Sequence, residues 1–573
     1  MKKIIISILV ILVIIISLFI FNKDKNIIEL SSDLISEQIK IDEEIRKYIN
    51  EDYKIDNPKI INNPYKISPL TSLIIFNDSN SVDVYLNNNY LYTSTNYNHL
   101  IPIYGLINNK DNIIKLVSNN NEYIYNIKPS IDSIKFDINK SNNDIYFTSY
   151  FNNENKYIAF NGLGEVIWNL DINSQSNIYP LDNGNFLVFA PEYINNGNVS
   201  FFTSILEVDY LGKIIKRYDT LYGAHHYLKV IDNYAFVLGS KESGTPMSII
   251  YKLNLDNGVV EDKLDLDELF INISDSWVNI LNKLYYGYDV NSIDYKDGNM
   301  LISIRNLNMI MEVNFNKKKL NYIFTNESDI LNILGDYNLS GNNLIYPVGC
   351  HDINYYNDYI TIFNNNMDYY NGLKKSVKDI KGTSNALIYK VDDKSIKLIK
   401  KYDGDTSSYA FGSFKNGNLI NYSYMFKNNN ELLSNPSNTY SRIVEYNKDN
   451  IVLDMKTNNN LYQVVKGNFI YKDYELKDYK YYSDNNYIDN DINIKNVDKL
   501  DNILNITNNY IECNLSNYQY KTLNIIFIGK KKYNIPYKGI RKYYSIDDGI
   551  YKVYVLLDGK YYDLGYSIKK KSK

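Results

Sequence analysis

Residues 181 to 189 read LDNGNFLVF, a polar turn of Asp, Asn and Gly followed directly by a short apolar strand. The same order recurs in IDNYAFVLG (231 to 239), KDGNMLISI (296 to 304), YNDYITIF (356 to 363) and FKNGNLINY (414 to 422). Successive starts lie roughly 50 to 65 residues apart, the length of one four-stranded propeller blade with its loops. The repeat predicts a six-bladed β-propeller over residues 133 to 475.

The flanking segments also indicate β structure, so the expected fold class is all-β. Residues 58 to 132 contain short alternating runs such as SLIIF, VDVYL and IIKLV between Asn and Asp turns, which predicts an N-terminal β-sandwich. Residues 476 to 573 predict a C-terminal β segment that closes or flanks the propeller. Asn triplets, including the one at 364 to 366, are interpreted as drift in turns without a function.

The N-terminus carries a membrane signal. Two lysines precede an apolar run from Ile4 to Phe21, and at ~1.5 Å per residue this run spans a hydrocarbon core of ~30 Å. No small-x-small cleavage signal follows, which favours an uncleaved signal anchor over residues 1 to 22 rather than a removed signal peptide. A membrane-proximal stalk with helical spacing follows at 23 to 57. The lysines place the body on the extracytoplasmic, periplasmic side, tethered to the inner membrane or released if the anchor is cleaved.

Composition excludes several function classes. The net charge is -4 and no basic block occurs, which argues against nucleic acid as a partner. No Cys/His cluster has zinc spacing, and no phosphate-binding glycine pattern occurs, so neither a metal nor a cofactor is expected. The two cysteines, Cys350 and Cys513, cannot build a disulfide scaffold. Cys350 fills space, pairs with Cys513 or touches the channel.

The scarce histidines follow the repeat. Only four occur in 573 residues, and His226 and His351 each stand five residues before a turn-and-strand segment. In the equivalent third region Asp289 precedes the turn and Arg305 ends the strand after it. Equivalent positions of successive blades face one channel, so these four side chains should converge there. Two imidazoles, a guanidinium and a carboxylate suit an anionic ester.

Several segments share their order with one known family. They are NPYKISPLTSLIIF (63 to 76), IPIYGLINNKDNIIKL (101 to 116), GEVIWNL, AHHYLKV, VNSIDY followed by LISIRN, and VGCHDI followed by ITIFNNN. Over roughly residues 60 to 470 the chain resembles the bacterial arylsulfate sulfotransferases, periplasmic six-bladed propellers with an N-terminal β-sandwich.

The resemblance implies a phenolic sulfate donor and a phenol acceptor as partners, with no nucleotide sulfate donor, cofactor or metal. It implies a ping-pong transfer through a sulfohistidine, in which His351 is the nucleophile, Arg305 stabilises the sulfuryl group and His226 assists. His225 is the register alternative to His226, and Asn291 belongs with the substrate-binding positions. A homodimer is left open.

One position departs from the family pattern. Where the family has a histidine two residues before an Asn-Ser pair, this chain has Asp289 before Asn291 and Ser292. A carboxylate could take the acceptor's proton, but in its ionised form it would repel a sulfate ester. Two alternatives therefore stay open: a catalytically degenerate envelope propeller that acts as a binding module, and an aryl sulfate hydrolase. Asp352 is interpreted as a turn former or as a carboxylate that fixes the His351 tautomer.

Overall fold

The computed structural model describes most of the chain after residue 33. The described residues are 27–29, 34–151, 155–174, 176–191, 193–196, 199–240, 245–284, 287–367, 382–408, 410–426, 439–482, 494, 497–499, 504–506, 511–513, 523–536, 549–557 and 560–570. The predicted signal anchor at 1 to 22 lies outside them. Within these ranges, no helix has both the length and the apolar character that a membrane crossing requires.

The chain divides into two compact units, one of residues 1–40, 192–194 and 485–573 and the other of residues 41–191 and 195–484. The first unit contains a sheet in the order β1-β42-β41-β39-β40, in which Ile525, Ile526, Val553 and Val555 are buried. Its strands are β1 (Ile27–Glu29), β36 (Asp498–Lys499) beside β42, β39 (Leu523–Ile528), β40 (Lys532–Pro536), β41 (Gly549–Leu557) and β42 (Lys560–Lys570), and a separate pair is formed by β37 (Leu504–Ile506) and β38 (Ile511–Cys513).

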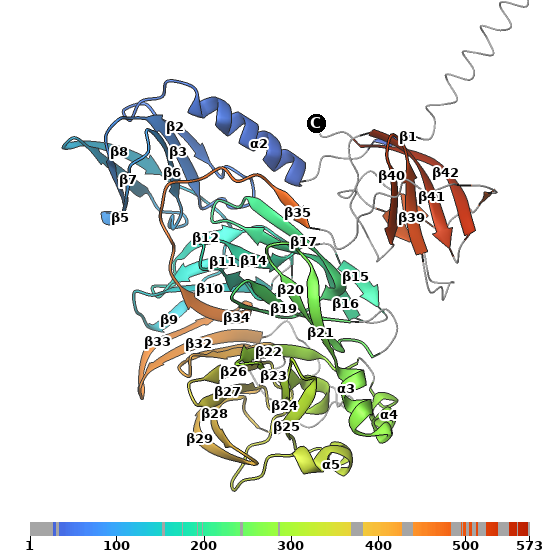
Figure 1. The fold of residues 1–573 in the computed structure, drawn as a ribbon. Helices are drawn as coiled ribbons and strands as arrows, with labels where there is room; N and C mark the ends of the chain where they lie inside the picture. Colours follow the sequence, from blue (N-terminus) through green and yellow to red (C-terminus); the bar gives the residue numbers. More distant parts are fainter. Residues whose placement is uncertain are drawn as a thin grey trace, which may run out of the picture. The chain divides into compact units, whose positions relative to one another are not determined.

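The second unit is built on six successive antiparallel sheets in the described residues, called sheets 1 to 6 (Figure 1). Sheet 1 is β34 (Asn460–Gly467), β10 (Ile145–Phe151), β11 (Asn155–Asn161) and β12 (Val166–Leu170), and sheet 2 is β13 (Tyr179–Pro180), β14 (Phe186–Phe189), β16 (Val199–Val208) and β17 (Ile214–Ala224), with β35 (Lys480–Tyr482) parallel to β17. Sheet 3 is β18 (Leu228–Ile231), β19 (Tyr234–Gly239), β20 (Ile249–Asn254) and β21 (Val260–Asp265), and sheet 4 is β22 (Val290–Lys296), β23 (Asn299–Ile304), β24 (Met309–Asn314) and β25 (Lys319–Phe324). Sheet 5 is β26 (Asp352–Tyr356), β27 (Tyr359–Asn364), β28 (Asn385–Asp392) and β29 (Ser395–Asp403), and sheet 6 is β30 (Ser413–Lys415), β31 (Leu419–Phe426), β32 (Thr439–Asn447) and β33 (Asn450–Thr457), with β9 (Asp137–Lys140) beside β33.

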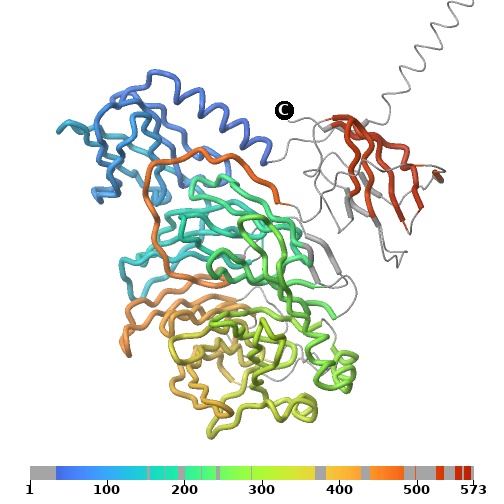
Figure 2. Tube along the Cα trace, viewed as in Figure 1, coloured from blue at the N-terminus to red at the C-terminus, as the bar shows by residue number. Residues whose placement is uncertain are grey.

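The first strands of neighbouring sheets contact one another in the order β13, β18, β22, β26, β30, β34. Sheet 1 contacts sheet 2 through the rings of Phe147 and Phe186, whose centroids are 5.4 Å apart. Strand β34 comes from the C-terminal end of this region, yet it pairs along β10 from the N-terminal end, as the adjoining orange and cyan tubes show (Figure 2). The fold of these residues is therefore all-β and propeller-like.

The repeated turn sequence corresponds to one structural position. Strands β14, β19, β23, β27 and β31, the second strands of sheets 2 to 6, lie in the five segments that carry the repeat. The turns before β19, β23, β27 and β31 place Asp232, Asp297, Asn357 and Asn416 at φ of 51° to 53°. Asp and Asn are the non-glycine residues that tolerate this left-handed conformation best. The strand positions predicted from the repeat are confirmed.

Residues before the repeat form two further sheets and a helix. The sheets are β2 (Lys59–Asn62), β3 (Ser72–Asn77) and β6 (Asn98–Ile103) in one, and β4 (Val82–Leu86), β5 (Asn89–Ser94), β7 (Asn112–Ser118) and β8 (Asn121–Ile127) in the other. Ile74 and Ile101 of one sheet and Val84 and Leu116 of the other belong to one hydrophobic cluster. Burial of such apolar surface contributes roughly 25 cal/mol per Å².

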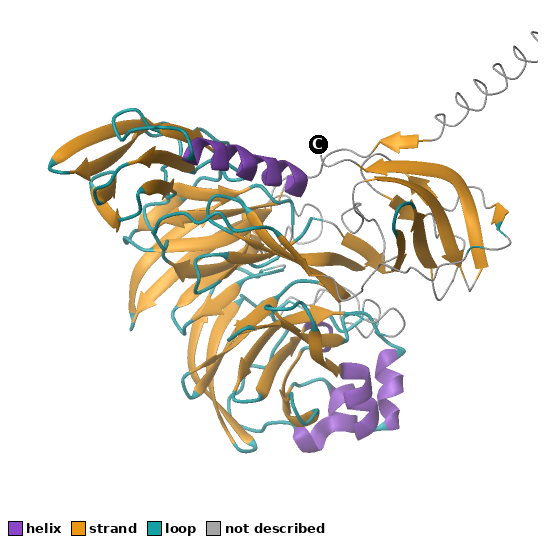
Figure 3. Cartoon of the chain, turned by 45° about the horizontal axis from the view of Figure 1, so that its top comes forward, coloured by secondary structure: helices purple, strands orange, loops and turns teal. Residues whose placement is uncertain are grey.

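The helices of the structure are few (Figure 3). They are α2 (Leu34–Ile49), α3 (Leu266–Ile273), α4 (Val278–Leu281) and α5 (Ser328–Leu334), with the short 3-10 turns η1 (Asp275–Trp277), η2 (Arg305–Leu307) and η3 (Gly335–Tyr337). Helix α2 falls in the segment expected to be a stalk, and its Asp42 accepts a hydrogen bond from Tyr65 at 2.8 Å. The domain boundaries derived from the sequence stay predictions.

Candidate functional site

Three residues of the predicted site stand directly before the first strands of successive sheets. His226 precedes β18, Asp289 precedes β22 and His351 precedes β26, while Arg305 follows β23 at the start of η2. His226 and Asp289 have positive φ angles of 53° and 52°. Such angles are uncommon for residues other than glycine and cluster at functional sites. The strand entrances therefore position these side chains as the repeat predicted.

Asp289 joins two of the predicted catalytic groups. Its Oδ2 accepts a hydrogen bond from Nη1 of Arg305 at 2.8 Å, and its Oδ1 lies 3.2 Å from Nε2 of His226. The backbone N–H of Arg305 also donates to the Asp289 carbonyl at 3.2 Å. Burial by itself would raise the pKa of the Asp289 carboxyl, but Arg305 and His226 outweigh burial and hold this pKa well below its usual range. Asp289 is therefore an ionised carboxylate.

The ring of His351 is held in one tautomer. Its Nδ1 lies 3.0 Å from the carbonyl oxygen of Gly349 and 2.8 Å from the amide oxygen of Asn365. Both partners are acceptors, because the amide nitrogen of Asn365 donates to the Phe411 carbonyl at 3.0 Å and so fixes the orientation of the amide. Nδ1 therefore carries the proton and Nε2 carries the lone pair. No protein group of the described residues hydrogen-bonds Nε2.

His351 is neutral at physiological pH. Burial, followed by the positive charge of Arg305, lowers the pKa of His351 to about 3, although Asp289 opposes this shift. The charges of Arg305 and Asp289 both act on His351, and Asp289 is bonded to His226, so the four predicted groups form one interacting set. A neutral imidazole with a bare Nε2 beside a guanidinium has the chemistry of a nucleophile for an anionic electrophile.

Asn365 was not expected at this site. It belongs to the Asn triplet at 364 to 366, which was interpreted as drift in a turn, and that interpretation is wrong for this residue. Only 1% of Asn365 is exposed, and its amide connects His351 to Phe411 and Ser408. The signal available in the sequence was its place directly after the apolar strand ITIFN.

An aromatic group beside His351 was also missed. The ring of Phe411 meets the imidazole of His351 edge to face, with centroids 6.1 Å apart. Phe411 also packs on Tyr462 at 4.7 Å and on Tyr424 at 5.3 Å. Phe411 and Tyr424 both have positive φ angles, 59° and 47°. These backbones are unfavourable for aromatic residues, so the surrounding structure must hold them in place.

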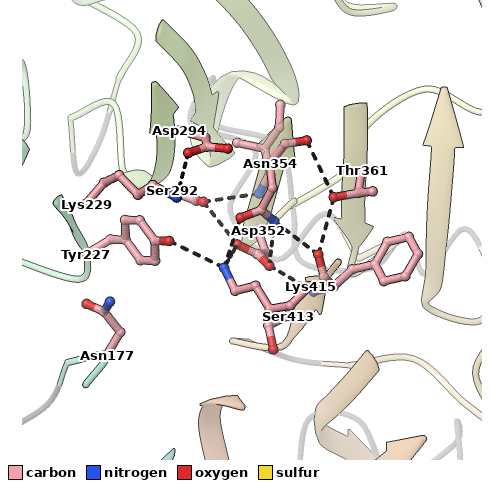
Figure 4. Close-up of polar contacts among 12 residues, drawn as sticks. Asn177, Tyr227, Lys229, Ser292, Asp294, Asp352, Asn354, Thr361, Ser413 and Lys415 are labelled. Carbon is pink, nitrogen blue, oxygen red and sulfur yellow. Dashed lines mark hydrogen bonds and ion pairs between the residues drawn. The ribbon is translucent and has the colours of Figure 1, made fainter. Parts of the chain in front are cut away.

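Asp352 has a different role from the one expected for fixing a tautomer. It is fully buried, and it accepts hydrogen bonds from Lys415 Nζ at 2.7 Å and from the Phe414 backbone N–H at 2.8 Å. Figure 4 shows Lys415 reaching toward Asp352, Asn354 and the Tyr227 hydroxyl. These residues come from strands of sheets 5 and 6 and the entrance of sheet 3. Asp352 therefore links the first strands below the site and does not contact the His351 imidazole.

The structure distinguishes the neighbouring histidines. His226 contacts Asp289, whereas the ring of the buried His225 packs edge to face against Phe201 at 5.3 Å. Burial lowers the pKa of His225 well below the usual value. Asn291 is also buried, with both amide atoms unpaired in the described structure. The His225 ring also packs edge to face on the ring of His226 at 5.2 Å, so it lies behind the group that is bonded to Asp289.

Cys350 is a buried free thiol in the hydrophobic cluster of sheets 4 and 5, and burial raises the pKa of that thiol. This corresponds to the space-filling interpretation. In the described residues, no group of three or more His, Cys, Asp or Glu side chains is arranged to hold a metal ion.

Solved structures with low similarity include the β-propeller domain of Cps50 (Swd1) from Myceliophteria thermophila, with 10% identity over 61% of this chain and 91% of that chain and a TM-score of 0.30. A putative 6-phosphogluconolactonase from Bacteroides uniformis has 11% identity over 70% of this chain and 95% of that chain, with a TM-score of 0.31. BamB from Moraxella catarrhalis has 9% identity over 74% of this chain and 92% of that chain, with a TM-score of 0.26. At these TM-scores the likenesses carry no argument.

No curated protein matches the chain. The family model described as Arylsulfotransferase (ASST), in contrast, matches residues 130–472. This range covers sheets 1 to 6 together with His226, Asp289, Arg305 and His351. Because the match extends over more than half of the sequence, this chain belongs to the arylsulfotransferase family.

Proposed function

We propose that this protein is an arylsulfate sulfotransferase that works by a ping-pong mechanism through a sulfohistidine at His351. The observation that carries the proposal is the tautomer of His351. Gly349 and Asn365 hold the proton on Nδ1, so the lone pair of Nε2 is available for attack on sulfur. Membership of the arylsulfotransferase family supports the choice of reaction.

In the first half-reaction Nε2 of His351 attacks the sulfur of an aryl sulfate. The N–S bond forms, the S–O bond to the aryl group breaks, and the phenol leaves with a proton. In the second half-reaction the oxygen of an acceptor phenol attacks the same sulfur, the N–S bond breaks and its electron pair returns to Nε2. The acceptor loses its proton in this step.

Arg305 stabilises the sulfuryl oxygens as charge develops on them. Its Nη1 is engaged by Asp289, whereas its Nε and Nη2 have no protein partner among the described residues. These remaining donors match the planar arrangement that binds two oxygens of an anion. The half-buried ring of Phe411 beside His351, which packs on the buried Tyr462, supplies an apolar surface for the aryl group of donor and acceptor.

The wider organisation follows from the same proposal. The six sheets would form a closed six-bladed propeller in which β34 completes sheet 1, and the two sheets before it would form the N-terminal β-sandwich. The apolar run from Ile4 to Phe21 would tether the protein to the inner membrane on its periplasmic side, or the protein would be released there after cleavage.

The test uses a chromogenic aryl sulfate labelled with radioactive sulfur. The proposal expects a burst of free phenol, one label per chain on His351, and turnover only with added phenol. Release that does not depend on a phenol would indicate a hydrolase, and neither release nor label would indicate a binding module. His351→Asn should take no label. His99→Gln is the matched control, because His99 lies on β6 outside the family match and should leave the label in place.

A further inference from the structure

We propose that Asp289 is a positioning residue that orients His226 to accept the proton of the acceptor phenol. This inference rests on the proposed sulfotransferase function and concerns its second half-reaction. Because this chain has a carboxylate where the family pattern has a histidine, the proton is carried by an imidazole and carboxylate pair built from sheets 3 and 4.

The geometry determines which nitrogen of His226 is the base. Nε2 lies 3.2 Å from Oδ1 of an ionised carboxylate, so Nε2 carries the proton and donates it in a hydrogen bond. The lone pair is then on Nδ1, which has no protein partner in the described ranges. The His226 side chain is 30% exposed, so a phenol can reach it, whereas the Asp289 side chain is only 12% exposed.

The position of His226 is fixed from a second direction. The Tyr462 hydroxyl donates a hydrogen bond to the His226 carbonyl at 2.9 Å. Tyr462 also packs against Phe411, which contacts the His351 ring. The proposed base and the proposed nucleophile are therefore held by the same aromatic group. A phenol lying against the half-buried Phe411 ring would border the His351 imidazole, while Tyr462 fixes the backbone that carries His226.

Asp289 itself is poorly suited to accept the proton. Oδ1 is engaged by His226 and Oδ2 by Arg305. Its charge is also balanced by Arg305, which reduces the repulsion that an isolated carboxylate would exert on a sulfate ester. The aspartate is thereby compatible with activity, and its effect passes through the two groups that it holds.

The proton balance closes over one cycle. The acceptor O–H transfers its proton to Nδ1 of His226 as the oxygen attacks sulfur and the N–S bond to His351 breaks. The resulting imidazolium is stabilised by Asp289. In the next first half-reaction the same proton passes to the departing phenolate, which returns His226 to its neutral form.

The experiment measures how fast the sulfur-labelled enzyme loses its label to a series of phenols of decreasing acidity. Dinitrophenols, the acidic end of the series, are largely ionised at neutral pH, whereas alkylphenols need a base. We expect Asp289→Asn to react with dinitrophenols almost as fast as the wild type and with alkylphenols about 10²-fold more slowly. Asp289→Glu keeps the charge and should recover much of the loss.

Two outcomes would overturn the inference. One is an Asp289→Asn rate that is unchanged or reduced by the same factor for every phenol, which would indicate a purely structural role. The other concerns the double variant of His226→Gln and Asp289→Asn. A rate with alkylphenols that falls further than in His226→Gln alone would overturn the inference, because a residue that acts only through His226 has no effect on this rate once His226 is gone. If the wild type takes up no label, the proposed function fails first and this inference with it.

Discussion

Two buried carboxylates at the entrances of neighbouring sheets, Asp289 and Asp352, differ in their partners. Asp352 is fully buried and accepts hydrogen bonds from Ser292, Asn354, the Phe414 backbone and Lys415. Asp289 is bonded to two side chains, and both are predicted catalytic groups. Lys415 also reaches Asn354 and Tyr227, whereas Arg305 keeps two nitrogens that no protein group in the described ranges engages.

The difference shows how one architecture separates stability from chemistry. Asp352 is a buried charge whose oxygens are all engaged by protein donors, and these bonds hold the strands in a fixed arrangement. A buried charge whose partners keep unused donors and lone pairs leaves capacity for a substrate. Carboxylates at adjacent places in two strand entrances can therefore carry opposite roles. Each variant below changes one of the two carboxylates or a residue near it.

The largest effect is expected for His351→Asn. The variant lacks the Nε2 lone pair, so the sulfuryl group has no acceptor on the enzyme. We expect at least about a 10⁴-fold loss of turnover and no labelled protein after incubation with a sulfur-labelled donor. Residual turnover near the wild-type rate would show that the nucleophile lies elsewhere.

Asp352→Asn tests the carboxylate whose oxygens are engaged by protein donors. It leaves the Lys415 ammonium buried without its counter-ion, which costs about 3 to 5 kcal/mol of stability. Denaturant unfolding should show this loss, while the labelling rate of the remaining folded protein should change little.

The double variant Asp352→Asn with Lys415→Met removes both charges and should recover part of the stability. A drop in labelling rate at unchanged stability would contradict the structural role of Asp352.

Arg305→Ala tests the partner of the other carboxylate. Loss of a donor that stabilises developing charge lowers the rate of a chemical step by about 10²- to 10³-fold. Single-turnover phenol release measures the effect. Arg305→Lys keeps the charge but loses the planar pair of donors, so its rate should lie between the rates of the wild type and of Arg305→Ala.

A smaller effect is expected for Asn365→Ala. The carbonyl of Gly349 still accepts from Nδ1 of His351, so only one of two hydrogen bonds is lost. A neutral hydrogen bond contributes about 1 kcal/mol, which corresponds to roughly a 5- to 10-fold slower labelling step. Ser384→Ala provides a nearby comparison, because its hydroxyl bonds the Asn365 backbone and not the side chain.

The labelling rate is not expected to respond to protonation of His351 over the usual pH range. Its pKa is lowered to about 3, so the neutral form predominates above that value and is lost only as the pH falls toward it. The rate of labelling should therefore show no acid limb from His351 between about pH 8 and pH 5. A fall of the labelling rate near pH 6.5 that persists when the other histidines are replaced would contradict the lowered pKa of His351.

The sequence predicted the local parts of the fold well and the distant pairings poorly. The turn residues before β19, β23, β27 and β31 carry a backbone preference of their own, so their pattern can be read directly. The pairing of β34 with β10 depends on partners from opposite ends of the repeat region and leaves no local signal.

The residues of the site likewise divide into those that the sequence predicted and those that it did not. His226, Asp289 and His351 were predicted because each precedes a turn and strand of the repeat, and Arg305 because it ends the strand after Asp289. In the structure Asp289 is bonded to His226 and Arg305, and Asp289 and Arg305 act on His351. Asn365 was missed because an Asn triplet resembles an ordinary turn. The tautomer role considered for Asp352 was wrong because Gly349 and Asn365 accept from Nδ1 of His351, while Asp352 accepts from Lys415 and the Phe414 backbone.

The pairing of β34 with β10 has a consequence for the order in which the protein matures. Chains generally fold from the N-terminus as they are synthesised, and β34 emerges after every other strand of sheets 1 and 3 to 6. It also brings Tyr462, whose hydroxyl holds the His226 backbone. A nascent chain that has completed sheets 2 to 5 already contains both histidines and the arginine but lacks this last contact. The late pairing of β34 with β10 thereby delays assembly of the site until nearly the whole family region has been made.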